Sequence, residues 1–206
     1  MDYGEYKVSR DLAWKIILDM GFTELPIKVS AICQKLGIEV RSYNKAKLLI
    51  EKYHLEYKTR KTDGFTLGIN GRCIIFYNDS CSKQRNRFTI AHELGHILLG
   101  HVPQKGIYLA TFSKGSSLEQ QANVFASRLL APVCVLKEVG IISVKQIAEL
   151  CGISETAAQY RFNRLNKLNE REQHFLRERG QSCYELSSLE REVLIRFQPY
   201  IKEHKL

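Results

Sequence analysis

Hydrophobic residues in the first quarter of the chain recur at the spacing of helices. Between residues 12 and 20, and again from Pro26 to Leu36, apolar side chains lie three or four positions apart. Gly21 and Gly37 follow these two segments as stop signals. We therefore expect two helices, the second beginning at Pro26. A short strand over residues 38–43 and a basic helical stretch over 44–54 are expected next.

Residues 64–77 have the pattern of a β-hairpin. Two runs rich in β-branched and aromatic residues, 65–69 and 72–77, meet across Asn70 and Gly71. An Asn-Gly pair favours the positive φ angles that a type I′ turn requires at both central positions. The pattern predicts an antiparallel pair of strands, and either strand could form the edge of a sheet.

The rest of the chain reads as helical. We expect helices over 83–99 and 117–130, two short helices within 143–168 around Gly152, and an amphipathic helix over 187–204. One small sheet followed by many helices indicates an α+β protein. The change in composition near 132–142 predicts one domain over residues 1–135 and an all-helical region over 136–206.

The run His92-Glu93-Leu94-Gly95-His96 matches the pattern H-E-x-x-H. Residues four apart share one face of a helix, so both imidazoles can bind one metal ion at about 2.0–2.1 Å. The glutamate between them then lies beside metal-bound water and can act as general base. An accidental match on an apolar helix is the alternative. The position of the run inside a strongly predicted helix, directly after a hairpin, favours the metal site.

A third protein ligand is expected, because catalytic zinc usually has three and keeps one position for water. His101 follows the first motif closely, but the metzincin pattern H-E-x-x-H-x-x-G-x-x-H needs glycine at position 99 and histidine at position 102. The chain has Gly100 and His101 instead, so the register is wrong. We interpret His101 as a polar residue just past the helix end.

Glu119 is the better candidate, because it lies at the start of the next predicted helix. An antiparallel arrangement of the two helices would bring its carboxylate to the metal. The alternative is a capping box, in which Ser116 and Glu119 bond each other's backbone amides and leave the metal alone. Asn123, one turn further on, could orient a ligand imidazole through a hydrogen bond.

Taken together, three segments resemble the ImmA/IrrE family of metallopeptidases. They are RFTIAHELGHILL at 87–99, EQQANVFA at 119–126 and LLAP at 129–132. The similarity extends to Pro26–Val40 and to the segment around Gly152. The two helix motifs occur in the order and at the spacing of the family, which makes the resemblance specific.

The resemblance implies a zincin-like fold and zinc-dependent hydrolysis of a peptide bond. It places one Zn²⁺ per chain on His92, His96 and Glu119, with Glu93 as general base. It also implies a protein substrate, a regulator such as a helix-turn-helix repressor of a mobile element or a stress response.

The segment from Gln146 to Leu165 reads as a helix-turn-helix, with a turn at Gly152. Its second helix carries polar and basic residues suited to phosphate or base contacts, namely Gln159, Arg161, Arg164 and Lys167. The alternative is a packing element with a solvated basic face, or a surface that docks a partner protein. Tyr160 and Arg161 are also open candidates for an oxyanion donor.

Two other functions therefore compete with the peptidase. One is a DNA-binding transcriptional regulator that uses its metal site as a structural element or a sensor. The other is an interaction module without activity, against which the intact Glu93 argues. The formal net charge of +9 is compatible with DNA contact but does not require it.

Composition sets the expected environment. Six cysteines occur with no C-x-x-C pair, the N-terminal residues are polar, and no apolar run approaches the ~20 residues needed to span a bilayer. We expect a cytoplasmic protein with reduced thiols and no membrane association. The pattern leaves the oligomeric state open.

Overall fold

The computed structural model describes residues 1–103, 105–109, 113, 115–179 and 186–205. They form two compact units. The first comprises residues 1–12 and 28–126, and the second comprises residues 13–27 and 127–206. The sequence-based division between residues 135 and 136 stays a prediction, and the compact units divide the chain differently.

The first unit contains a four-stranded sheet in the order β1-β3-β2-β4. The strands are β1 (Glu39–Ser42), β2 (Gly64–Ile69), β3 (Arg72–Tyr77) and β4 (Ile107–Leu109). Strands β2 and β3 pair in antiparallel fashion, and Asn70 and Gly71 between them have φ angles of 47° and 85°. The predicted hairpin and its I′-type turn are therefore confirmed.

The prediction that one hairpin strand forms an edge of the sheet is wrong. Strand β3 also pairs with β1 in parallel, and β2 also pairs with β4 in antiparallel fashion. In the part of the chain that the structure describes, β1 and β4 are the edges. Strand β4 is three residues long and was not predicted, because so short a run has no readable alternation.

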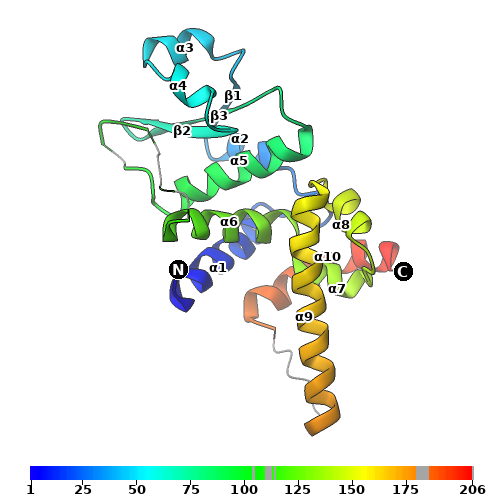
Figure 1. The fold of residues 1–206 in the computed structure, drawn as a ribbon. Coiled ribbons are helices and arrows are strands. Elements are labelled where there is room, and N and C mark those ends of the chain that lie inside the picture. The colour runs from blue at the N-terminus through cyan, green and yellow to red at the C-terminus, as the bar shows by residue number, and fades with distance from the viewer. Residues whose placement is uncertain (104, 110–112, 114, 180–185, 206) are drawn as a thin grey trace. The chain divides into compact units, whose positions relative to one another are not determined.

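Helix α5 lies between the sheet and helix α6 in the first unit (Figure 1). The helices that begin in this unit are α1 (Tyr3–Asp19), α2 (Val29–Lys35), α3 (Lys47–Lys52), α4 (Glu56–Thr59), α5 (Lys83–Leu98) and α6 (Ser117–Leu130). The observed bounds of α6 match the prediction, and those of α5 differ by one residue. Helix α2 begins at Val29 rather than at Pro26, with Lys28 as its N-cap.

The predicted helical stretch over 44–54 is shorter and broken. The backbone of His54 has a φ of 53°, which no α-helix accommodates, and a second short helix follows. This turn lets Leu55 enter a hydrophobic cluster between these short helices and the sheet. The buried members of that cluster are Ala46, Ile50, Leu55, Phe65, Leu67 and Phe76.

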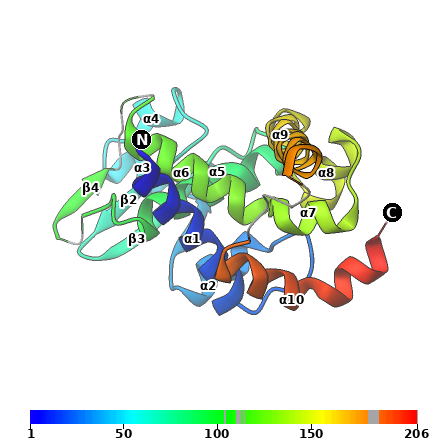
Figure 2. The same cartoon turned by 90° about the horizontal axis from the view of Figure 1, so that it is seen from below.

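The second unit is helical. Its main elements are α7 (Val133–Val139), α8 (Val144–Cys151), α9 (Glu155–Arg179) and α10 (Ser188–His204). Helix α8 lies beside the N-terminal part of α9, as Figures 1 and 2 both show. The terminal helix is confirmed, and Ser187 with Glu190 forms a capping box at its start. Helix α9, at 25 residues, is much longer than predicted.

A mixed fold with a small sheet and many helices agrees with the expected zincin-like domain and helical segment. Among the described residues, no helix is both long and apolar enough to cross a bilayer.

Candidate metal centre

Helix α5 begins at a side-chain cap and passes very close to α6. The Ser82 hydroxyl oxygen accepts a hydrogen bond from the backbone N–H of Arg85 at 3.2 Å. Further along, Gly95 faces α6: a Cβ added there would lie 2.9 Å from Phe125 and 3.3 Å from the Cα of Ala122. The absence of a side chain at Gly95 is what allows the two helices to approach.

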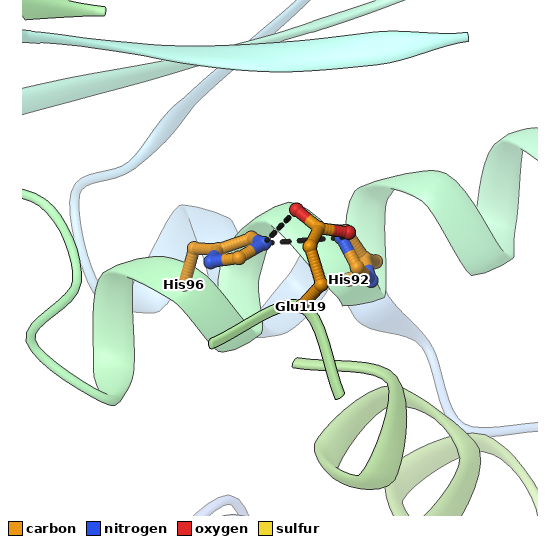
Figure 3. Close-up of side chains that lie close together, drawn as sticks. All are labelled: His92, His96 and Glu119. Carbon is orange, nitrogen blue, oxygen red and sulfur yellow. Dashed lines mark hydrogen bonds and ion pairs between the residues drawn. The ribbon is translucent and has the colours of Figure 1, made fainter. Parts of the chain in front are cut away.

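Three side chains from α5 and α6 converge on one point (Figure 3). His92 and His96 lie one turn apart on α5, and their Nε2 atoms are 3.0 Å apart. The two carboxylate oxygens of Glu119, on α6, lie 3.3 Å from Nε2 of His92 and 3.3 Å from Nε2 of His96. His96 is almost fully buried, at 1% exposure, whereas Glu119 keeps a quarter of its side chain exposed.

The backbone hydrogen bonds near Glu119 show whether Ser116 and Glu119 form a complete capping box. The backbone N–H of Glu119 donates to the Ser116 hydroxyl at 3.3 Å, which is half of a capping box. The other half is missing, because the N–H of Ser116 donates to the carbonyl of Ser113. Ser116 therefore caps the helix, while the carboxylate of Glu119 faces the two imidazoles.

The charges of the cluster are strongly coupled. Burial opposes ionisation of Glu119, but hydrogen bonds from His92 and His96 outweigh it and lower the pKa of Glu119 to about 2. Burial likewise opposes protonation of His92, yet its contacts with Glu119 and Glu93 raise the pKa of His92. Burial lowers the pKa of His96. The cluster thus holds an ionised carboxylate beside imidazoles.

Glu93 is buried next to the cluster. Its carboxylate accepts a hydrogen bond of 2.7 Å from the hydroxyl of Thr66, a fully buried residue of β2. Burial raises the pKa of Glu93, although His92 and the Thr66 hydrogen bond oppose the shift. Thr66 was not among the site residues predicted from the sequence. A polar residue in an otherwise apolar strand was the available signal.

Each imidazole has a partner on the nitrogen that faces away from the cluster. Nδ1 of His92 lies 3.0 Å from Oδ1 of Asn123, as the sequence predicted for that asparagine. Nδ1 of His96 lies 2.9 Å from Nδ1 of His101. His101 follows the helix end as expected and is outside the convergent cluster, but its contact with His96 was not predicted.

The structure corrects the prediction for Arg161. That residue is 3% exposed, and its Nε and Nη2 both donate to the backbone carbonyl of Ala131, at 3.0 and 2.5 Å. A guanidinium held there is not available to a phosphate or a base. Tyr160, in contrast, is 74% exposed and lines a shallow groove between α8 and α9.

The residues present fit a zinc ion. Ligand atoms on a tetrahedral zinc with bonds of about 2.0–2.1 Å lie about 3.3 Å apart, close to the observed separations of 3.0, 3.3 and 3.3 Å. Two imidazoles and one carboxylate form a donor set of catalytic zinc. Within the described residues, these three side chains form the one such group of potential ligands.

A family model described as the IrrE N-terminal-like domain, Peptidase_M78, matches residues 33–163. The chain belongs to this family. The matched region contains all three members of the His–His–Glu cluster as well as Glu93, so the site lies in a metallopeptidase domain. No curated protein matches the chain.

Proposed function

We propose that this chain is a zinc-dependent endopeptidase that holds one Zn²⁺ on His92, His96 and Glu119. The observation that carries the proposal is the convergence of these three side chains within 3.3 Å of one another. The buried carboxylate of Glu93 on the same helix completes the arrangement. Membership of a metallopeptidase family supports the reaction type.

Bound zinc would supply Lewis acidity, which polarises a peptide carbonyl and makes water a nucleophile near neutral pH. Glu93 takes the proton from the attacking water and passes it to the nitrogen of the leaving amine. The water oxygen joins the carbonyl carbon as the C–N bond breaks. The raised pKa of Glu93 suits this work, because it brings the carboxylate closer to the working pH. Thr66 holds the carboxylate in place.

Strand β4, an edge of the sheet among the described residues, is a suitable place for an extended substrate. The N–H of Asn70 donates to the carbonyl of Gly106, so residues 70 and 106 form a hydrogen-bonded pair. Hydrogen-bonded and non-hydrogen-bonded pairs alternate along an antiparallel ladder. The next pair, Ile69 and Ile107, is therefore non-hydrogen-bonded, and the backbone N–H of Ile107 points away from β2. A peptide could add to that side as a further strand.

Proline at position 107 tests this mode of binding. Ile107→Pro removes an outward N–H without breaking a bond to β2 and should raise KM for a peptide substrate more than it lowers kcat. Strand addition at β4 is wrong if Ile107→Pro leaves KM unchanged.

We also propose that the substrate is a regulatory protein, such as a helix-turn-helix repressor, cleaved in the cytoplasm. The resemblance of the motifs supports this substrate class, and the cysteine pattern supports the location. Incubation of the zinc-loaded protein with purified helix-turn-helix repressors, followed by mass spectrometry of the products, would identify the bond that is cut, and intact repressors would count against this substrate class.

Glu93→Gln is the decisive variant for the mechanism. It keeps the shape of the side chain and removes the base, so kcat should fall by a factor of about 10²–10⁴ while stoichiometric zinc binding is retained. Glu149→Gln makes the same change at an exposed position of α8 and should have no effect. Cleavage at the wild-type rate by Glu93→Gln would show that the assigned mechanism is wrong.

A second candidate function rests on the groove between α8 and α9. It is lined by Lys145, Thr156, Gln159, Tyr160 and Asn163, among others, and these side chains could contact a duplex. In this alternative the protein is a DNA-binding transcriptional regulator. Titration of duplex DNA at several salt concentrations would test it, because binding through phosphates alone weakens steeply with salt. Sequence-specific binding unaffected by Glu93→Gln would favour it.

A further inference from the structure

A chain of polar contacts runs from His96 to the start of α1, entirely within the first unit. Nδ1 of His96 lies 2.9 Å from Nδ1 of His101, and Nε2 of His101 lies 3.4 Å from Oε1 of Gln121. The amide nitrogen of Gln121 donates to Glu5 at 3.1 Å and to Ser117 at 3.2 Å. His96 and Gln121 are both buried.

The end of helix α5 brings His101 back over His96. The N–H of His101 donates to the carbonyl of His96, and the N–H of Gly100 donates to the carbonyl of Ile97. With Gly100 at a φ of 76°, these two bonds form a Schellman motif. This motif usually places two apolar side chains in contact across the helix end. Here it places two imidazoles in contact instead.

The direction of the hydrogen bonds follows from the carboxylate at the far end. The carboxylate of Glu5 can only accept, so the NH₂ group of Gln121 faces it and the amide oxygen faces His101. Nε2 of His101 must then carry a hydrogen. In a neutral ring this leaves a lone pair on Nδ1 of His101, which accepts from Nδ1–H of His96. Nε2 of His96 keeps its lone pair and points it at the cluster.

We propose that His101, Gln121 and Glu5 are positioning residues that hold His96 in the tautomer offering Nε2 to the metal. His92 is held in the same tautomer by a single contact of its Nδ1 with Oδ1 of Asn123, at 3.0 Å. The two histidine ligands thus have different supports. His92 has one residue of α6, and His96 has a chain of three residues that ends at Glu5, in the first turn of α1. This inference rests on the proposed zinc site.

Zinc affinity, measured by competition with a chelator, tests the proposal without any substrate. Gln121→Leu and His101→Phe fill similar space but cannot continue the chain, and each should weaken zinc binding by a factor of about 10–100. The d–d bands of the Co²⁺-substituted protein should shift in both variants. Equal zinc affinity in wild type, Gln121→Leu and His101→Phe would overturn the proposal.

Two matched variants separate positioning from packing. Gln120→Leu makes the same substitution on the neighbouring, exposed residue of α6 and should leave zinc affinity unchanged. His101→Asn places a side-chain oxygen near the position of Nδ1, so it can still accept from His96 and should bind zinc more tightly than His101→Phe. If His101→Asn is as weak as His101→Phe, the hydrogen bond is not the cause.

Long-range ¹H–¹⁵N correlation spectra of the wild-type protein provide a test that does not depend on the folding of a variant. They should show His101 protonated on Nε2 and His96 protonated on Nδ1, with and without zinc. The opposite tautomer of His101 would overturn the proposal. Failure of the wild-type protein to take up zinc would instead refute the proposed function, and the spectra of the metal-free protein would still decide the direction of the chain.

Discussion

Helix pair α5 and α6 and helix pair α8 and α9 both carry sequence motifs, but they bury different kinds of side chain. The first pair encloses His96, Glu93 and Gln121, each with a polar partner. The second pair encloses mainly apolar side chains, namely Ile147, Cys151, Ile153, Ala158 and Leu165, together with Arg161. The one buried charge of that group is held by a backbone carbonyl.

This difference shows how the same local element, a helix with chemistry-bearing residues, can serve two purposes. The two histidines of α5 direct the lone pairs of their Nε2 atoms at a common point, because Asn123 and His101 contact their Nδ1 atoms. The guanidinium of Arg161 donates twice to the carbonyl of Ala131, just past the C-terminal end of α6, and stabilises the second unit instead. Residue type alone did not distinguish the two cases.

Removal of a ligand from the first pair should have the largest effect. His96→Ala should weaken zinc binding by about a hundredfold or more, because a zinc binding free energy of about 10–16 kcal/mol is shared by a few ligands. Peptide hydrolysis should be lost with the metal. The control is His174→Ala, an exposed histidine of α9. Metal analysis and chelator competition measure the effect, and zinc retention in His96→Ala would refute the ligand assignment.

Substitutions in the helix pair α8 and α9 should change the stability of the protein rather than its affinity for zinc. Arg161→Leu leaves the carbonyl of Ala131 without its charged donor and should lower the free energy of unfolding by about 1.5–3 kcal/mol. Arg164→Leu, exposed on the same helix, should change it by less than about 0.5 kcal/mol. Denaturant titration followed by circular dichroism would measure both. A loss of zinc affinity in Arg161→Leu would show that the two helix pairs do not have separate roles.

The close approach of α5 and α6 can be tested at Gly95. Gly95→Ala places a Cβ against Phe125 and Ala122 and should cost about 1–2 kcal/mol of stability. It should also weaken zinc binding, because Glu119 reaches the histidines from the displaced helix. Gly4→Ala, in the first turn of α1, meets only Oδ1 of Asp2, at 3.2 Å, and should cost less stability than Gly95→Ala. If the two variants behave alike in thermal melts, the helix contact is not tight at Gly95.

The smallest expected effect is a difference in the pH dependence of stability between substitutions of two buried ionisable groups, in the metal-free protein. Burial raises the pKa of Glu93 above its ordinary 4.5, and burial raises the pKa of Cys134 from 9.0 to about 12. The stability contributed by protonated Glu93 is fully present below pH 4.5 and is lost as the pH rises through its folded-state pKa. Glu93→Gln should therefore become more stable relative to wild type between pH 4.5 and 8.

Cys134→Ala supplies the contrast, since the thiol stays neutral in both the folded and the unfolded state below pH 9. Its difference in melting temperature from wild type should be constant between pH 4.5 and 8. A Glu93→Gln difference that is equally constant would show that the carboxylate is not held in an environment that opposes its charge.

The sequence by itself determined the features that depend on local spacing. The i, i+4 spacing placed His92 and His96 on one face of a helix, and Asn70-Gly71 predicted the hairpin. Family resemblance selected Glu119. The spacing pattern alone could not choose between capping and metal binding at Glu119, because both use the first turn of the same helix.

Only the tertiary structure decided which groups meet across long distances in the chain. It placed β4 at the edge of the sheet, buried Arg161 against Ala131, and joined Glu5 to Gln121 across 116 positions. Such pairings depend on how elements pack, and sequence periodicity reports only which face of an element is buried. The contact of His101 with His96 is intermediate. The sequence predicted that His101 lies just past the helix end, but only the folded chain showed that two imidazoles meet there.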